Sequence, residues 1–139
     1  MRKINYSSAN TIFGVIVSIF SFVVFSLTVE PTASYWDCAE YISTSAKLQV
    51  GHPPGAPLFQ MLGAIFSTFA FESDQIALSI NMMSVTSSAL TILFLFWSIS
   101  HLIKGFVSLK KNISIIEAIK IFGSSTLGSL TFTFTDSFW

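Results

Sequence analysis

The residues whose types and spacing fit chemistry lie in one stretch near the first third of the chain. Asp37 and Glu40 are three residues apart, and His52 follows inside a Gly-His-Pro-Pro-Gly-Ala-Pro run. Residues 36–50 contain neither Gly nor Pro, so we expect them to form a helix. Side chains three residues apart share one face of a helix. Two carboxylates on one face can act as a general base or bind a cation.

Other polar residues extend this predicted face. Tyr41, Thr44 and Lys47 follow Glu40 at helical spacing, and Gly51 suits the C-cap that ends such a helix. His52 fits hydrogen bonding to a phosphate or orientation of a carboxylate. One histidine with two acids has no recognisable zinc spacing, so we expect no bound metal, although paired carboxylates leave a divalent cation open.

A purely structural interpretation of the same residues stands beside the chemical one. The segment from Ser34 to Asp37 matches the capping-box pattern, in which the serine caps the helix and the acid three residues later binds back to the backbone. In that interpretation Asp37 is structural, Glu40 is merely solvated, and His52 makes a local turn contact.

Composition indicates that these residues stand on a membrane protein. The chain is 52% hydrophobic and only 10% charged, whereas soluble domains carry about 25% charged residues. The formal net charge is zero, which gives no basic surface for a nucleic acid. The single cysteine, Cys38, excludes an internal disulfide.

Three apolar runs, at about 11–29, 76–103 and 113–135, have the length that roughly 30 Å of hydrocarbon requires. The first is interpreted as a retained signal anchor because it is long and lacks a small-x-small cleavage site. A fourth run, 56–71, is shorter. If only the three long runs span and the N-terminus is cytoplasmic, six of the seven basic residues lie inside, as the positive-inside rule requires. Residues 30–75 then form an external loop in which 56–71 is a juxtamembrane helix at the outer interface.

Polar residues within the spans are interpreted as packing residues. Small side chains let membrane helices approach closely, and we expect this role for Ser84, Ser87, Ser88, Ser124, Ser125, Gly128 and Ser129. Asn81 is expected to bond a neighbouring helix. The Asn-x-Ser matches at Asn5 and Asn112 fall on the predicted cytoplasmic side, so glycosylation is not expected there.

The run from Glu30 to Tyr41, with the Lys47 to Phe59 segment that ends in His-Pro-Pro-Gly-Ala-Pro-Leu-Phe, resembles the opening of a known family. Its members are large polytopic membrane proteins, common in Bacteroidetes and of unknown function, that are related to a eukaryotic transmembrane protein O-mannosyltransferase. The segments Asn81-Met-Met-Ser and Phe134-Thr-Asp-Ser-Phe-Trp match its pattern too. More distantly, the layout is similar to GT-C type glycosyltransferases.

The resemblance implies an all-α membrane protein with three transmembrane helices, the N-terminal part of a GT-C-like fold. Residues 1–139 would be one N-terminal fragment of a longer chain, inactive alone. The resemblance places the protein in the bacterial inner membrane, with a cytoplasmic N-terminus and residues 30–75 in the periplasm.

The implied activity is transfer of a sugar from a polyprenyl-phosphate donor to an acceptor such as a protein hydroxyl, at the outer face of the membrane and without a cofactor. Asp37 would be the essential acid and Glu40 its neighbour, while His52 would lie in a juxtamembrane helix lining the donor cavity. Tyr41, Lys47 and Asp136 complete the expected substrate-binding residues. The alternatives are a non-enzymatic transport or envelope-assembly component, whose acids bind without turnover, and a small oligomerising three-helix protein.

Overall fold

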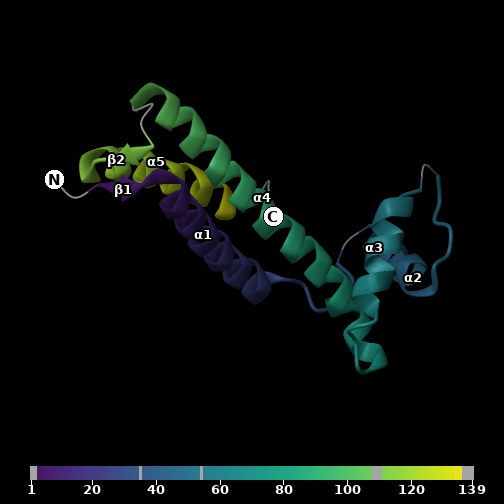
Figure 1. The fold of residues 1–139 in the computed structure, drawn as a ribbon. Coiled ribbons are helices and arrows are strands. Elements are labelled where there is room, and N and C mark those ends of the chain that lie inside the picture. Colours follow the sequence, from purple (N-terminus) through teal and green to yellow (C-terminus); the bar gives the residue numbers. More distant parts are fainter. Residues whose placement is uncertain (1–2, 35, 54, 108–110, 136–139) are drawn as a thin grey trace. The chain divides into compact units, whose positions relative to one another are not determined.

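The computed structural model of the protein describes residues 3–34, 36–53, 55–107 and 111–135. Almost all regular structure in these ranges is helical, which confirms the all-α class (Figure 1). In chain order the elements are β1 Ile4–Asn5, α1 Tyr6–Thr28, α2 Cys38–Lys47, α3 Pro57–Ser67, the 3-10 helix η1 Ser73–Gln75, α4 Ile76–Val107, β2 Asn112–Ile113 and α5 Ile115–Thr133.

The chain divides into two compact units. The first unit comprises Met1–Phe25 and Ser88–Trp139, and the second comprises Ser26–Ser87. The first therefore holds most of α1, the later part of α4, and α5. The second holds α2, α3, η1 and the start of α4.

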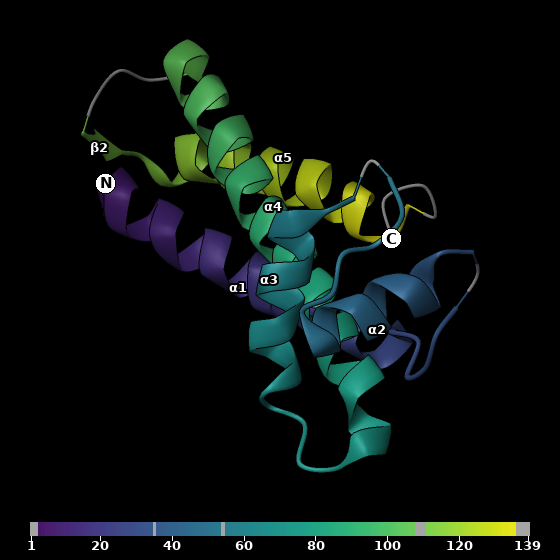
Figure 2. The same cartoon turned by 90° about the vertical axis from the view of Figure 1, so that its right-hand side faces the viewer.

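In the first unit, a two-residue antiparallel ladder joins the starts of two helices. Ile4 pairs with Ile113 and Asn5 pairs with Asn112, so α1 and α5 begin side by side (Figures 1 and 2). The Asn5 side chain accepts a hydrogen bond from the Ser7 backbone at 3.1 Å, in the manner of a helix cap. Both Asn-x-Ser matches therefore lie at helix starts, where they serve local structure.

A capping box begins α5. The Ser114 hydroxyl accepts from the Glu117 backbone at 3.3 Å, and the Glu117 carboxylate accepts from the Ser114 backbone at 2.7 Å. Each residue satisfies a backbone donor of the other. Glu117, which lies inside the predicted apolar span 113–135, therefore has a structural role at the start of α5.

Aromatic stacking forms the core of the first unit. The Phe122 ring of α5 stacks on Tyr6 and Phe13 of α1 and on Phe96 of α4, with centroids 5.8, 5.1 and 6.5 Å away. Small residues line the same contacts. The side chains of Ser125 and Ser129 are fully buried and bond their own helix, and a Cβ added at Gly128 would come within 3.0 Å of Ile99. The packing role predicted for these residues of α5 is confirmed.

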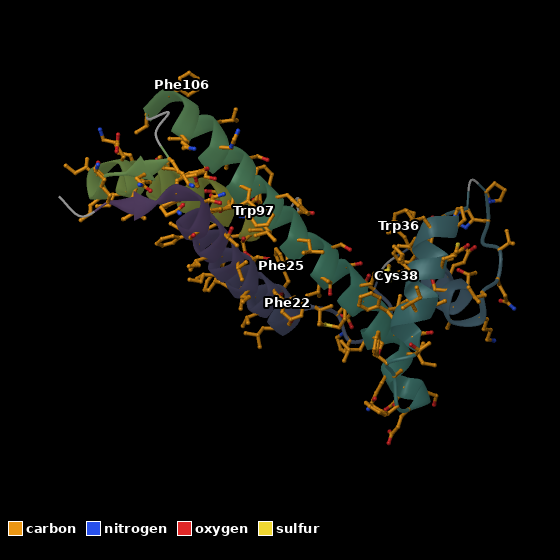
Figure 3. The ribbon with its side chains drawn as sticks, in the orientation of Figure 1. Phe22, Phe25, Trp36, Cys38, Trp97 and Phe106 are labelled. Carbon is orange, nitrogen blue, oxygen red and sulfur yellow. The ribbon has the colours of Figure 1, made fainter. Side chains whose placement is uncertain are left out.

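Two helices of the described chain are long and apolar enough to cross a membrane, namely Tyr6–Thr28 and the continuous Ser73–Val107. The 23 residues of α1 extend about 35 Å, against the roughly 30 Å that a bilayer core requires. Apolar side chains cover the outside of these helices (Figure 3). The third span, 113–135, is helical as α5 but does not meet the same criterion, so it stays a prediction.

In the second unit, α2 and α3 pack closely against each other. Helix α3 begins with Pro57 in the first turn, a favourable position for proline, and its 11 residues extend only about 17 Å, too short to span. A Cβ at Gly63 would lie 2.8 Å from the Ser45 side chain of α2, so only glycine allows this approach. Asn81 donates to the backbone oxygens of Glu30 and Thr32 at 2.8 and 3.0 Å. The expectation that Asn81 bonds a neighbouring helix was wrong, because its partners are in the loop after α1.

Candidate functional site

The start of α2 decides what the first carboxylate does. The helix begins at Cys38, preceded by Trp36 with a positive φ of 55° and by Asp37 at the N-cap with φ −77° and ψ 1°. Asp37 makes no side-chain capping hydrogen bond. The predicted helix start was therefore two residues too early, and the capping box from Ser34 to Asp37 does not form. The Asp37 carboxylate is therefore available for contacts other than capping.

The end of α2 brings the next segment back along the helix. Leu48 takes a left-handed conformation at φ 49°, its N–H donates to Ser45, and the Gln49 N–H donates to Thr44 at 2.8 Å. This pair of bonds is a Schellman ending. The helix thus ends before Gly51, which was expected to be its C-cap. Gly51 instead fits closely beside the side chains of Glu40 and Gln60, where an added Cβ would lie 3.2 and 3.1 Å away.

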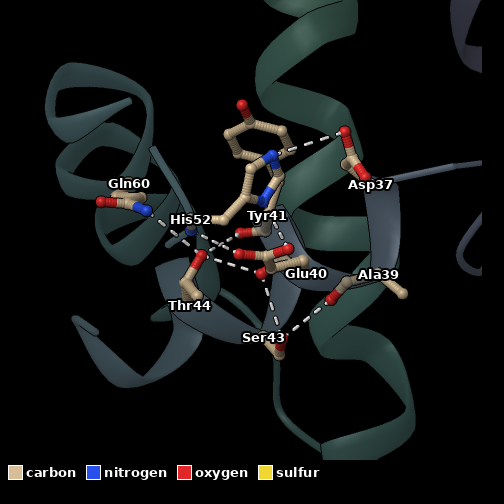
Figure 4. Close-up of polar contacts among 8 residues, drawn as sticks. All are labelled: Asp37, Ala39, Glu40, Tyr41, Ser43, Thr44, His52 and Gln60. Carbon is tan, nitrogen blue, oxygen red and sulfur yellow. Dashed lines mark hydrogen bonds and ion pairs between the residues drawn. The ribbon is translucent and has the colours of Figure 1, made fainter. Parts of the chain in front are cut away.

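The returning segment places His52 against Glu40. The Glu40 Oε1 atom accepts from the His52 backbone N–H at 2.7 Å, and Oε2 lies 2.7 Å from His52 Nδ1 (Figure 4). On the other side of the ring, Nε2 is 3.8 Å from Asp37 Oδ2. His52 therefore lies in the loop between α2 and α3, which corrects its predicted place in a juxtamembrane helix.

Both partners of the Glu40–His52 contact have shifted pKa values. The hydrogen bond from the His52 backbone, followed by the bond to the His52 ring, lowers the pKa of Glu40. The side-chain bond to Glu40, with the attraction of its charge, raises the pKa of His52, and the Asp37 charge adds a smaller upward effect. Both shifts favour a carboxylate paired with an imidazolium. The three side chains remain partly open to solvent, with Asp37 58% exposed and His52 48%.

Residues around this group connect it to α3. The Tyr41 ring packs edge to face on Phe59 at 5.4 Å. The Thr44 hydroxyl donates to the Glu40 carbonyl at 2.8 Å and accepts from the Gln60 amide at 3.3 Å (Figure 4). Packing of α2 on α3 therefore supports the helix that carries Asp37 and Glu40.

Two predicted site residues are not brought into the group. Lys47 is exposed in the last turn of α2, and its side chain makes no hydrogen bond or ion pair within the described ranges. Asp136 falls outside the residues that the structure describes.

The same group has the ligand types of a metal site. Asp37, Glu40 and His52 each offer a ligand atom, and these atoms lie within 4.8 Å of one another. The sequence singled out all three residues but showed no metal-site spacing, because the distance from Glu40 to His52 depends on how the loop after α2 turns back. The early helix end and the close fit of Gly51 are what bring the three together.

The fold and this site define the chain as part of a helical membrane protein with an Asp-Glu-His site in the segment after its first long helix. Residues 37–139 match the family described as the Protein O-mannosyl-transferase TMEM260 N-terminal domain. The match covers well over half of the chain and starts at Asp37, and the chain belongs to this family. The relation expected from the sequence is confirmed.

Two curated relatives share part of this region. The chain is 32% identical over 78 residues to Protein O-mannosyl-transferase tmem260 of Dictyostelium discoideum, an alignment covering 55% of this chain and 10% of the relative. It is 32% identical over 88 residues to Protein O-mannosyl-transferase TMEM260 of Mus musculus, covering 62% and 12%. The chain thus spans about a tenth of the length of these relatives. No solved structure matches it.

Proposed function

We propose that this chain forms part of a membrane glycosyltransferase that moves a sugar from a polyprenyl-phosphate donor to an acceptor hydroxyl at the outer face of the membrane. The observation that carries the proposal is the solvent-open Asp37 carboxylate beside the Glu40–His52 pair, at the start of the segment matched by the family. The named activity of the relatives supports a protein hydroxyl as acceptor and mannose as the sugar.

Asp37 suits the general base better than Glu40 does. Both Glu40 oxygens bond His52 at 2.7 Å, so using Glu40 as a base would break these contacts. The Asp37 carboxylate is more exposed, and its ion-pair contact with His52 is longer at 3.8 Å. Asp37 can therefore receive a proton without dismantling the pair beside it.

The chemistry assigned to Asp37 is a substitution at the anomeric carbon of the donor sugar. The acceptor hydroxyl gives its proton to the carboxylate while its oxygen forms a bond to that carbon. The bond from the carbon to the phosphate oxygen breaks, and the lipid phosphate leaves with the electron pair. General-base help contributes about a hundredfold to ten-thousandfold in rate. His52, Tyr41, Lys47 and Asp136 are proposed as substrate-binding residues, and the scheme requires no cofactor.

The proposed location is the inner membrane of a bacterium, with a cytoplasmic N-terminus and residues 30–75 in the periplasm. The β1–β2 pairing supports this orientation because it brings the starts of α1 and α5 together at one end of the first unit. At that end the Lys104 ammonium lies 4.2 Å from the centre of the Tyr6 ring, and the Lys111 carbonyl accepts from the Tyr6 N–H. Basic residues concentrate on the cytoplasmic side of membrane proteins.

The test uses the full-length protein in lipid vesicles with labelled polyprenyl-phosphate sugars. We expect Asp37→Asn to lower the transfer rate by a hundredfold or more, since the amide cannot accept the proton. Glu72→Gln is the matched control, because Glu72 is an exposed acid of the same unit whose side chain makes no capping bond. Unchanged transfer by Asp37→Asn would refute its role, and binding without transfer of any sugar would favour a transport or assembly component.

A further inference from the structure

The charge around the site favours binding of a cation, which would also offset the charge of a phosphate-linked donor. Residues 26–87 contain five acidic residues and one basic residue, Lys47. Asp37, Glu40 and His52 together carry a formal charge of −2 when the imidazole is neutral and −1 when it is protonated. Lys47 makes no ion pair with them in the described structure. The site by itself therefore repels a phosphate and attracts a cation.

The gap between Asp37 and His52 has the size of a shared ligand position. Nε2 and Oδ2 are 3.8 Å apart, longer than the roughly 3.2 Å limit of a good hydrogen bond. A cation about 2.1 Å from each atom would make a nitrogen–cation–oxygen angle of about 130°. A small movement of either side chain brings this angle into the range of common coordination geometries. The two atoms are thus too far apart to bond each other well and close enough to bind one ion.

When His52 is neutral, Glu40 selects the tautomer that such an ion requires. Its carboxylate bonds Nδ1 at 2.7 Å and fixes the backbone of His52 with its second oxygen. With the proton of a neutral imidazole held on Nδ1, the lone pair is on Nε2, the atom that faces Asp37. A carboxylate that holds the far nitrogen of a ligand histidine is a recurrent outer partner in metal sites.

We propose that Asp37 Oδ2 and His52 Nε2 bind one divalent first-row transition cation, with Glu40 as the residue that positions His52 and with the other Asp37 oxygen left to take the acceptor proton. A mixed nitrogen and oxygen ligand pair suits Mn²⁺, Fe²⁺, Co²⁺ or Zn²⁺ better than Mg²⁺ or Ca²⁺, which prefer oxygen alone. Both ligand side chains are about half exposed, so further coordination positions are open to water or to a phosphate oxygen. The role of the ion in binding the donor phosphate rests on the proposed glycosyltransferase function. Binding of the ion by the protein does not depend on that function.

The experiment titrates Mn²⁺ into chelator-treated full-length protein and follows bound metal by electron paramagnetic resonance. We expect one Mn²⁺ per chain, with a coordinated nitrogen visible in the pulsed spectrum. Asp37→Asn and His52→Gln should each weaken binding at least tenfold, and His52→Gln should remove the nitrogen signal. Glu40→Gln should weaken binding about ten- to a hundredfold, as loss of such outer partners does elsewhere. Glu72→Gln should bind as the wild type does.

Circular dichroism of each variant shows that the helices are intact, so loss of binding is not loss of fold. No bound Mn²⁺ in the wild type, or binding that survives both ligand substitutions, would overturn the metal site. Sugar transfer at an unchanged rate by metal-free protein would overturn the ion's role toward the donor while leaving the proposed function in place. Stoichiometric Mn²⁺ binding without transfer of any sugar would overturn the proposed function and leave the metal site in place.

Discussion

At the scale of single residues, Glu40 organises the site although it is not its most reactive group. Its two oxygens bond both the backbone and the ring of a histidine twelve positions later. This two-point contact fixes the orientation of the imidazole, so the second ring nitrogen faces Asp37. Substitution of Glu40 should therefore act mainly through His52.

The first prediction concerns the titration of His52 in metal-free protein. Glu40→Gln should lower the pKa of His52 toward its ordinary value of 6.5, because the bond and the charge of Glu40 are the two largest causes that raise it. Asp37→Asn should lower the same pKa less, since the Asp37 charge is a smaller contribution. Proton resonances of the His52 ring followed against pH measure both changes. An equal effect of the two substitutions would contradict the geometry.

The second prediction gives the pH range in which the pair stabilises the fold. The folded pKa of His52 is raised, so its contribution is complete below the unfolded value of 6.5 and is lost as the pH rises through the folded pKa. The folded pKa of Glu40 is lowered, so its contribution is complete above the unfolded value of 4.5 and is lost as the pH falls through the folded pKa. Thermal unfolding midpoints of wild type and Glu40→Gln should differ most between pH 4.5 and 6.5, and should converge below the folded pKa of Glu40 and above the folded pKa of His52.

At the scale of elements, the close packing of α2 on α3 holds the helix that carries both acids. Gly63→Ala should lower the free energy of unfolding by about 1–3 kcal/mol, because the new methyl group overpacks the contact with Ser45. The added Cβ would sit 2.8 Å from the Ser45 Cβ and hydroxyl oxygen, whereas at Gly105 of α4 it would meet nothing within 4 Å. Thermal unfolding in detergent should show destabilisation for Gly63→Ala only. Equal midpoints for both variants would argue against the α2–α3 packing.

The same elements show what the sequence could and could not predict. Long apolar periodicity predicted α1 and α4 correctly, since burial and length leave little choice over twenty or more residues. The C-terminal end of α2 was missed because it depends on Leu48 in a left-handed conformation, which usually selects glycine. Orientation of a carboxylate by His52 was one of the expectations, but the choice of Glu40 and the short distance follow from that ending and could not be predicted. A capping box forms at Ser114, where none was predicted, and does not form at Ser34, where the pattern suggested one, so tertiary context decided between two similar local signals.

At the scale of the whole molecule, the β1–β2 pair determines which helix ends share one end of the first unit. The starts of α1 and α5 meet there. Lys3 and Lys111 directly precede the two strands, Lys104 lies in the last turn of α4, and Lys120 lies in α5. The acidic residues of the loop segment belong to the second unit. This separation of charge along the chain is what the proposed orientation depends on.

The orientation predicts which positions a membrane-impermeant thiol reagent reaches in intact cells. Cys38→Ser first removes the single native thiol, and Asp74→Cys or Lys111→Cys then introduces one exposed cysteine on each predicted side. With residues 30–75 periplasmic, the reagent should label the thiol at position 74 in intact cells. The thiol at position 111 should react only after the cells are permeabilised. Labelling of both thiols in permeabilised cells is the control that both are accessible. Labelling at 111 but not at 74 in intact cells would reverse the orientation. Asp37, Glu40 and His52 would then face the cytoplasm, and an acceptor outside the cell would have no route to Asp37.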